Sequence, residues 1–565
     1  MNVNLVTTSL SESFFEKNNF LLGKWCLFDK ENYLKKKTNV SYIHKDIWLN
    51  SDKLQKDYDY SISLFNRIFP ILYRTLNEKL GANKNDEFYW KILIGPWLIY
   101  FLQISINRWE TLKSFTCNYE KIYTKILDFD SPTRPKNFYE FVSMFVSDTW
   151  NHKLFSCMIY FLSENENKNQ FVIEKKKIKN NYNYVEKKRY KKNFTFPHNE
   201  KIFFYNSNFT FLDKIKMIYH LKKIPIFLEK INIDSEKEKE KIDFNLDFLT
   251  ENNFEIFLKK NLLKFLPLYL YDNYESDWIK IKKLNLPKKI NTIFSNVFTH
   301  DSVISRYFAE MKHIGSKLIS FQHGGIYGQY RISTAEKLEI DLSDTFLTWG
   351  WNKVDNKKVK PFFYSKNIKK TNRQSREKIH FVLPNKPKYS YRIDSFSGIE
   401  KLENNYKKTL EIIESLDQNL KEKIILKDKK NFYSNYFKEL IFNNYKKYIK
   451  YDEIEKYYSI SRINIFPYLS TAYLESFLLN LPTIILYNEK DQILNKECLK
   501  YFSKLKRFNI VQDNPKSLAD FINNNWKNID DWWNDNELQK ELNYFKKHYL
   551  NISENKILNI KNICK

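Results

Sequence analysis

The chain has 565 residues, of which 42% are hydrophobic and 17% are aromatic. That is enough apolar surface for large buried cores, so it excludes global disorder, and the length favours two or three domains. Lys and Arg outnumber Asp and Glu by 94 to 67, a formal charge of +27, which leaves nucleic acid, anionic lipid or an anionic substrate as partners to weigh.

The excess of basic residues is better explained by drift in amino-acid composition than by selection for positive charge. The basic residues are mostly lysines spread along the chain, without an arginine-rich arm, and only 9 residues are glycine. An A/T-rich genome produces this Lys-, Asn- and Ile-rich pattern unaided, so we expect no nucleic-acid partner. The 5 cysteines are far apart and odd in number, which suggests neither disulfides nor a metal site. With no signal-peptide pattern at residues 1–10, we expect a cytoplasmic protein.

The first part of the chain predicts short strands followed by long helices. Residues 4–10 (NLVTTSL) are typical of a first strand and its loop, and 20–29 and 40–48 predict further strands or strand ends. Helical periodicity follows over 54–80, 88–112 and 137–162. The apolar run 92–106 is shorter than the roughly 20 residues of a membrane span, so it predicts a buried helix.

Two polar segments interrupt this pattern. Residues 164–199 are Lys/Asn-rich with weak periodicity and predict a solvated insertion, and 234–242 (DSEKEKEKI) is a second charged run. We expect a domain boundary between 242 and 287 and place it so that residues 1–285 form an N-terminal, acceptor-side α/β domain. Residues 286–565 then form a C-terminal, nucleotide-donor-binding Rossmann-like domain.

After residue 287 strands and helices alternate regularly. Strands are predicted at 289–296, 316–322, 379–385, 423–427, 463–468, 483–488 and 509–513, and helices at 300–314, 405–420, 470–480, 492–504 and from 515. Such alternation is typical of right-handed βαβ units in a parallel sheet. The predicted fold class is therefore α/β, with two Rossmann-like domains facing a cleft.

The stretch FQHGGIYG, residues 321–328, concentrates glycine in a glycine-poor chain. It follows a predicted strand, and ligands of open parallel sheets bind outside the carboxyl ends of the strands. Glycines let the backbone approach a ligand closely, and successive N–H groups can cradle phosphate oxygens. His323 would then donate to a phosphate or act as acid or base. The alternative is a tight turn with a capping histidine. The candidates here are Gln322, His323, Gly324, Gly325 and Gly328.

A second stretch, STAYLESFLLNLPT, begins at Ser470. Ser470 and Thr471 lie at the predicted N-cap of a helix that follows a strand, where unpaired N–H groups and the helix dipole attract an anion. Glu475 is one turn further on and could reach a ribose hydroxyl pair. The alternative is an ordinary capped helix with a solvent-facing glutamate.

These stretches carry a family resemblance. STAYLESFLLNLPTII resembles the donor-nucleotide site of GT-B glycosyltransferases. The whole chain is similar to a family of transferases encoded in bacterial O-antigen and surface-polysaccharide loci, through LVTTSL, FLLGKWC, YWKILIGPWLIYF, QHGGIYG, DTFLTWGW, STAYLESFLLNLPT and DDWW. The QHG element also resembles the Kdo transferases of capsule assembly and glycerophosphotransferases.

The resemblance implies a GT-B-like fold and a glycosyltransferase activity. The donor would be a nucleotide-activated sugar, CMP- or NDP-linked, acting as co-substrate with no tightly bound cofactor. The acceptor would be a glycan or lipid-linked glycan precursor of O-antigen or capsule, reached in the cytoplasm or at the inner face of the cytoplasmic membrane. By this route His323 and Glu475 become donor-site residues. No DxD pair in a suitable loop suggests a metal, so we expect a metal-independent enzyme.

Further candidates rest on weaker signals. Where the family has a basic and aromatic R-x-Y-P loop, this chain reads KDKKNFY, and Lys427 would replace the missing charge. Ser295 and Asn296 end one predicted strand, and Arg392 follows another; all three are expected to bind the donor. In the N-terminal half Thr7, Thr8, His44 and Asp46 lie at predicted strand ends, where an acceptor base is sought, and His44 and Asp46 join His323 as catalytic candidates.

Two alternative functions remain open at this point. A polyol-phosphate transferase of the CDP-glycerol type would use the same fold. A non-catalytic polyanion-binding protein would use the charge of +27, but it leaves the glycine cluster unexplained.

Overall fold

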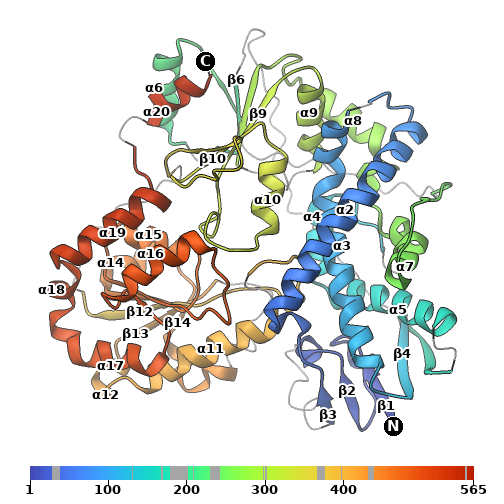
Figure 1. Ribbon diagram of the computed structural model, residues 1–565, viewed down its shortest axis with the longest axis horizontal. Coiled ribbons are helices and arrows are strands. Elements are labelled where there is room, and N and C mark those ends of the chain that lie inside the picture. The colour runs from blue at the N-terminus through green and yellow to red at the C-terminus, as the bar shows by residue number, and fades with distance from the viewer. Residues whose placement is uncertain are drawn as a thin grey trace.

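Three parallel β-sheets form the framework of the protein (Figure 1). The computed structural model describes residues 1–27, 39–84, 86–129, 132–166, 169–178, 202–207, 209–228, 242–296, 298, 302–364, 376–395, 398–429, 438, 440–553 and 556–564. We call each sheet with its helices the N-terminal, middle and C-terminal unit. The α/β class with parallel sheets is confirmed, but there is one sheet more than the two-domain prediction allowed.

The N-terminal unit has the sheet order β3-β2-β1-β4-β5, which is the 3-2-1-4-5 order of a doubly wound fold. The central strands β1 and β2 are largely buried, whereas β3 and β5 at the two edges are mostly exposed. Its strands are β1 (Asn2–Val6), β2 (Asn19–Leu21), β3 (Val40–Ile43), β4 (Lys121–Phe129) and β5 (Phe171–Ile178). Its helices are α2 (Ser51–Lys79), α3 (Glu87–Thr116), α4 (Phe138–Phe145) and α5 (Asp148–Asn165), with α7 (Asn253–Asn261) packed on α5.

The middle unit has the order β11-β10-β9-β8-β6-β7, the flavodoxin-like arrangement in which the first and third strands are neighbours. Strand β8 is buried along its whole length, as expected for a central parallel strand. The strands are β6 (Ile202–Tyr205), β7 (Ile226–Leu228), β8 (Thr292–Ser295), β9 (Lys317–Phe321), β10 (Thr345–Thr348) and β11 (Val359–Pro361). The helices are α6 (Phe211–Leu221), α8 (Tyr274–Lys282), α9 (Ser302–His313) and α10 (Thr334–Asp341).

The C-terminal unit has the order β14-β13-β12-β15-β16-β17, the 3-2-1-4-5-6 order of the Rossmann fold. The order reverses between β12 and β15, so ligands are expected at the carboxyl ends of these two strands. The strands are β12 (Lys378–Val382), β13 (Ile424–Lys427), β14 (Ile449–Lys450), β15 (Ser461–Phe466), β16 (Thr483–Leu486) and β17 (Val511–Gln512). The helices are α11 (Ile399–Glu414), α12 (Gln418–Lys421), α14 (Ile454–Ile460), α15 (Thr471–Leu478), α16 (Lys496–Lys506), α17 (Pro515–Asn525), α18 (Ile529–Trp533) and α19 (Asn536–Tyr549).

Helix α3 is the buried spine of the structure. Asp86 caps it by accepting from two backbone N–H groups, and its apolar residues face α2, α5 and α9 in two units. Among the described residues, α3 is the one helix long and apolar enough to cross a membrane. However, 94% of its most apolar 18-residue window is buried inside the structure. The predicted buried helix at 92–106 is therefore confirmed, and Trp97 is fully covered.

Gln103, in the middle of α3, connects all three units. Its amide N–H donates to Ser61 Oγ of α2 at 3.1 Å. Its carbonyl oxygen accepts from Thr334 Oγ1 of the middle unit at 3.1 Å and from Ile393 N, beyond β12, at 2.8 Å. One fully buried side chain thus satisfies polar groups from three separate regions of the chain.

The predicted domain boundary at 285/286 is wrong because it cuts the middle sheet. Strands β6 and β7 precede this point, and β8 pairs directly with β6 through Phe294 and Phe204. Part of the predicted insertion at 164–199 is also ordered, since β5 pairs with β4. Residues 179–199 of that insertion and 234–241 of the second charged run lie outside the described residues.

The chain crosses between the middle and C-terminal units twice. It leaves the middle unit after Tyr364 and returns after Asn551 to end in α20 (Lys556–Cys564), which packs on α6 (Figure 1). The two crossings lie side by side, because Tyr364 N donates to Asn551 O at 2.8 Å. Asn551 Nδ2 also donates to Phe362 O at 2.8 Å.

Replacing Gln103 with Leu should destabilise the whole chain. The substitution leaves buried polar groups of Thr334 and Ile393 with one bond fewer, at a cost of about 3 kcal/mol for the set. We expect a clear fall in the urea midpoint followed by tryptophan fluorescence, and little change for Gln418→Leu at an exposed position of α12. Equal midpoints for both variants would contradict a connecting role for Gln103.

Candidate functional site

The turn that follows β9 meets the N-terminus of α15. Gly325 N donates to Thr471 Oγ1 at 3.1 Å, across 146 positions of sequence. A Cβ atom on Gly325 would lie 2.6 Å from Thr471 Cα, so only glycine allows this approach. The two stretches that the sequence singled out therefore lie against each other, at the carboxyl edges of two sheets.

The rest of the turn is held by its own side chains. Gln322 is buried; its carbonyl oxygen accepts from Trp349 N and Trp351 Nε1, and its amide donates to Gly324 O at 2.8 Å. Gly328 has a φ of +74°, in the left-handed region that favours glycine, and its N–H donates to the Glu336 carboxylate at 2.8 Å. Gln322 and Gly328 thus shape the turn, and their contact with a donor stays a prediction.

The side chain of His323 is partly exposed. Its Nδ1 lies 3.2 Å from Oε2 of Glu339, whose side chain is fully buried in α10. Tyr327 OH donates to the other oxygen of the same carboxylate at 2.9 Å. A carboxylate beside Nδ1 favours the tautomer with its proton there, which leaves Nε2 as the nitrogen able to accept a proton. Sequence reasoning missed Glu339, because it lies 16 residues further on in a helix without a motif.

The N-terminus of α15 is capped as predicted. Ser470 Oγ accepts from Ala472 N at 3.3 Å, while Thr471 Oγ1 is the acceptor for Gly325. Glu475, one turn into the helix, accepts from Tyr364 OH at 3.4 Å. This contact places Glu475 beside the point where the chain leaves the middle unit.

Ser295 and Asn296 end the strand next to the turn. Ser295 pairs with Ser320 of β9, so these residues adjoin the segment that carries His323. Asn296 Oδ1 accepts from Asn206 Nδ2 at 3.5 Å, at the switch point between β6 and β8. Both side chains are buried, so they support the edge of the site.

Lys427 and Arg392 are engaged inside the C-terminal unit. Lys427 Nζ donates to Asp428 O at 2.5 Å, and burial lowers the pKa of this lysine. Arg392 Nε donates to the buried Asp394 carboxylate at 2.6 Å. Burial raises the pKa of Tyr327 in the turn of His323, and Arg392 is near enough to oppose that rise. Residues 430–433 of KDKKNFY lie outside the described residues.

His44 and Asp46 contact other elements than the turn of His323. His44 Nε2 lies 2.8 Å from Ser114 Oγ of α3, and burial lowers its pKa. Asp46 accepts from Trp48 N at 2.9 Å, and its own N–H donates to Glu400 of α11 at 2.9 Å. Burial, with the nearby Glu400 charge as a smaller cause, raises the pKa of Asp46 to about 6.

Asp46 also fills the N-terminal end of α11. A Cβ on Gly398, the residue before this helix, would collide with Asp46 Oδ2. The first helix after strand 1 is where Rossmann folds attract pyrophosphate. Because a carboxylate of the chain already occupies that place, the start of α15 remains the predicted anion site of this unit.

The ligand crevice of the N-terminal sheet is filled in the same way. Lys388 Nζ donates to Asp148 Oδ2 at 2.5 Å and to Ser9 Oγ at 2.9 Å, and Tyr389 OH donates to Asp148 Oδ1 at 2.6 Å. Ser9 follows β1 and Asp148 begins α5, while Lys388 and Tyr389 come from the loop after β12. We call residues 383–395 the junction loop. Sequence reasoning missed Asp148 and Lys388 because 240 residues separate them.

Thr7 and Thr8 lie beneath this contact. Both hydroxyls are 3.4 Å from His152 Nδ1, and His152 Nε2 accepts from Leu127 N at 2.9 Å. Burial lowers the pKa of His152 to about 4, so the imidazole is neutral at physiological pH. This cluster is closed and supports the sheet.

The described residues contain no group of three or more His, Cys, Asp or Glu side chains placed to hold a metal. Metal independence stays a prediction.

The chain is similar to one transferase family over almost its full length. The profile of the LIC12162 family transferase matches residues 3–562. No curated protein matches the chain significantly.

Three solved structures share a distant likeness. The glycotransferase of kitacinnamycin is 8% identical over 65% of this chain and 99% of its own, with a TM-score of 0.34. The wall teichoic acid polymerase TagF (H444N with CDPG) is 11% identical over 64% and 87%, with a TM-score of 0.29. WaaG, a glycosyltransferase of lipopolysaccharide biosynthesis, is 8% identical over 64% and 99%, with a TM-score of 0.29. Similarity at this level says nothing about substrate.

Substituting Gly325 with Ala should separate the two stretches of the site. The new Cβ would meet backbone atoms of Thr471, so we expect a loss of stability of about 2–4 kcal/mol. Gly95→Ala is the matched control, because its Cβ would meet no atom nearer than 3.6 Å and alanine favours the helix. Thermal unfolding of both variants checks this; equal melting temperatures would show that the close approach is not required.

Asp46→Asn should change how stability depends on pH. Burial raises the pKa of Asp46 from the ordinary value of 3.8 to about 6, so the folded state binds more protons than the unfolded state between these two pH values. Stability of the wild type should therefore fall as pH rises through this window, whereas the amide side chain of the variant does not titrate.

We expect the free energy of unfolding of Asp46→Asn, relative to wild type, to rise by about 2–3 kcal/mol between pH 4 and pH 7.5. Urea titrations at both pH values measure it, with Asp355→Asn at an exposed position as control. A difference that stays constant with pH would show that the Asp46 carboxyl titrates normally.

Proposed function

The chain belongs to the LIC12162 family of transferases, and we propose that it transfers a sugar from a nucleotide-activated donor to a surface-polysaccharide precursor of the O-antigen or capsule type. One observation carries the proposal: the contact of Gly325 with Thr471 joins the glycine turn of one sheet to the helix N-terminus of another. Both elements suit an anion, and they face a shared edge.

The donor phosphates would bind at the start of α15. Its first backbone N–H groups and the positive end of the helix dipole stabilise negative charge, including the charge that develops on the departing nucleotide. Glu475 would accept hydrogen bonds from the ribose hydroxyls. Charge stabilisation by these groups needs no metal ion, so we propose a metal-independent transfer.

His323 would act where the sugar changes partner. An acceptor hydroxyl attacks the anomeric carbon, the bond from that carbon to the phosphate oxygen breaks, and the hydroxyl proton must leave. Nε2 of His323 would take that proton or donate to the phosphate, while Glu339, 3.2 Å from Nδ1, would orient the ring. We propose His323 as the catalytic residue and Glu339 as its positioning residue.

Of the other catalytic candidates, the contacts of His44 and Asp46 favour structural roles. The acceptor would be a glycan or lipid-linked glycan, which places the enzyme in the cytoplasm or at the inner membrane face. Transfer of a polyol phosphate from a CDP-linked donor would use the same anion site, and the choice of nucleotide separates the two.

Nucleotide binding tests the proposed function. We expect one of CMP, CDP, UDP, GDP and dTDP to raise the melting temperature by several degrees, since a ligand at 100 times its Kd stabilises by about 2.7 kcal/mol. The increment should vanish in Glu475→Ala and fall in His323→Ala, and EDTA should leave it unchanged. CDP as the preferred nucleotide would favour polyol-phosphate transfer.

His313→Ala is the matched control, because His313 and His323 side chains are both 32% exposed. Small, salt-sensitive increments with all five nucleotides, equal in every variant, would instead indicate a general polyanion binder.

A further inference from the structure

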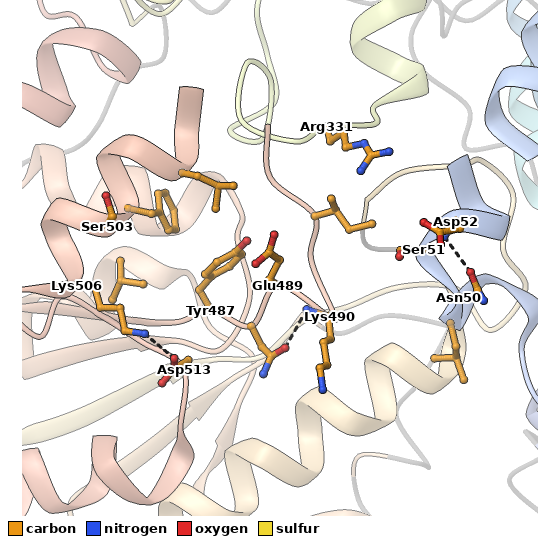
Figure 2. Close-up of a pocket in the computed structure, with 16 residues that line it drawn as sticks. Asn50, Ser51, Asp52, Arg331, Tyr487, Glu489, Lys490, Ser503, Lys506 and Asp513 are labelled. Atoms are coloured by element: carbon orange, nitrogen blue, oxygen red, sulfur yellow. Dashed lines mark hydrogen bonds and ion pairs between the residues drawn. The ribbon is translucent and has the colours of Figure 1, made fainter. Parts of the chain in front are cut away.

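A cavity of about 880 Å³ opens where the three units meet (Figure 2). Its walls come from the start of α2, from Arg331 of the middle unit, and from α16 and the loops after β16 and β17. Its size lies in the range of roughly 300–1,000 Å³ typical of small-molecule sites, which gather at domain interfaces and strand carboxyl ends. None of the candidates predicted from sequence lines it.

The charges around the cavity are balanced. Figure 2 shows Glu489 and Lys490 on the loop after β16, facing Asp52 and Arg331 across the opening. Lys506 pairs with Asp513 at 2.6 Å at the far end. A diphosphate here would meet as many carboxylates as cations, so the lining does not favour an anionic ligand.

The neutral lining suits a ligand rich in hydroxyls. Carboxylates accept from hydroxyl groups, ammonium and guanidinium groups donate to them, and amide and serine side chains do both. Apolar residues provide surface for the C–H faces of a ring. The amide and hydroxyl groups are those of Asn50, Ser51, Asn488 and Ser503, and the apolar residues are Leu49, Ile493, Leu499, Phe502 and Val511.

One buried glutamine links this cavity to the candidate site. Gln492 Oε1 accepts from Leu469 N, just before α15, at 2.9 Å and from Tyr330 OH, just after the glycine turn, at 3.1 Å. The next residues, Arg331 and Ile493, are joined by a backbone hydrogen bond of 3.0 Å and line the cavity. The cavity and the proposed donor site therefore share a wall.

We propose that this cavity binds a neutral carbohydrate chain, the acceptor of the transfer. The assignment of this carbohydrate as the acceptor rests on the proposed function. The binding of a carbohydrate rests only on the residues that line the cavity. Acceptor recognition then belongs to a site built by all three units, with the nucleotide held separately at α15.

Saturation-transfer NMR on the full chain tests the proposal, with maltotriose, cellotriose and chitotriose as neutral probes and inorganic diphosphate as the charged probe. We expect at least one trisaccharide to bind and diphosphate to leave its signal unchanged. Ser503→Trp should weaken trisaccharide binding at least tenfold, because position 503 is exposed and lines the cavity, so the indole fills it. Glu489→Gln should weaken it about tenfold through a lost charged hydrogen bond.

Lys500→Trp is the control, three residues away on the same helix, with a side chain 72% exposed and outside the lining. It should bind trisaccharide like the wild type. The proposal is overturned if no trisaccharide binds. It is also overturned if diphosphate competes with a bound trisaccharide and Ser503→Trp abolishes the binding of diphosphate.

The nucleotide increments of the preceding subsection, measured on the same variants, separate the two proposals. Nucleotide binding without trisaccharide binding overturns the cavity assignment alone. Trisaccharide binding without nucleotide binding overturns the proposed function and leaves a carbohydrate-binding cavity.

Discussion

The close approach of Gly325 to Thr471 is the constraint on which the site depends. It fixes the carboxyl edge of the middle sheet against that of the C-terminal sheet, with no side chain on the glycine to hold the two backbones apart. A chain with only 9 glycines keeps one where a methyl group would push two sheets apart. The glycine cluster thus allows the two units to touch, in addition to any role in binding a ligand. The same contact positions His323, which lies in this turn.

The N-terminal unit acts on the site through the junction loop. This loop begins at β12, places Lys388 against Asp148 of the N-terminal unit, and then reaches Ile393, which donates to Gln103 of α3. The crevice where a doubly wound sheet would bind a ligand is therefore filled by the chain itself. The sheet of the N-terminal unit thus holds the junction loop in place. This explains why the polar residues at the carboxyl edge of that sheet are buried and paired.

The features that the sequence predicts are those set by residues close together in the chain; contacts between residues far apart in sequence were not predicted. Strands after residue 287 alternate with helices at short range, so β8, β9, β12, β15 and α15 were predictable, as were Ser470 and the glycine turn. The middle sheet was divided wrongly because α7 and α8 separate β7 from β8. Glu339 and Asp148 carry no local signal, since their partners lie far away in sequence. Polar candidates such as Arg392 and Lys427 turned out to have buried partners that no motif reveals.

The paired crossings between the middle and C-terminal units decide how these units can move. Two connections far apart would lock the units together, and a single one would let them swing in any direction. Here Tyr364 and Asn551 are hydrogen-bonded to each other, so the two connections are tied together at one place. Helix α15 is also held to the middle unit at two points one turn apart, Thr471 through Gly325 and Glu475 through Tyr364, which favours a rigid junction over one that swings open.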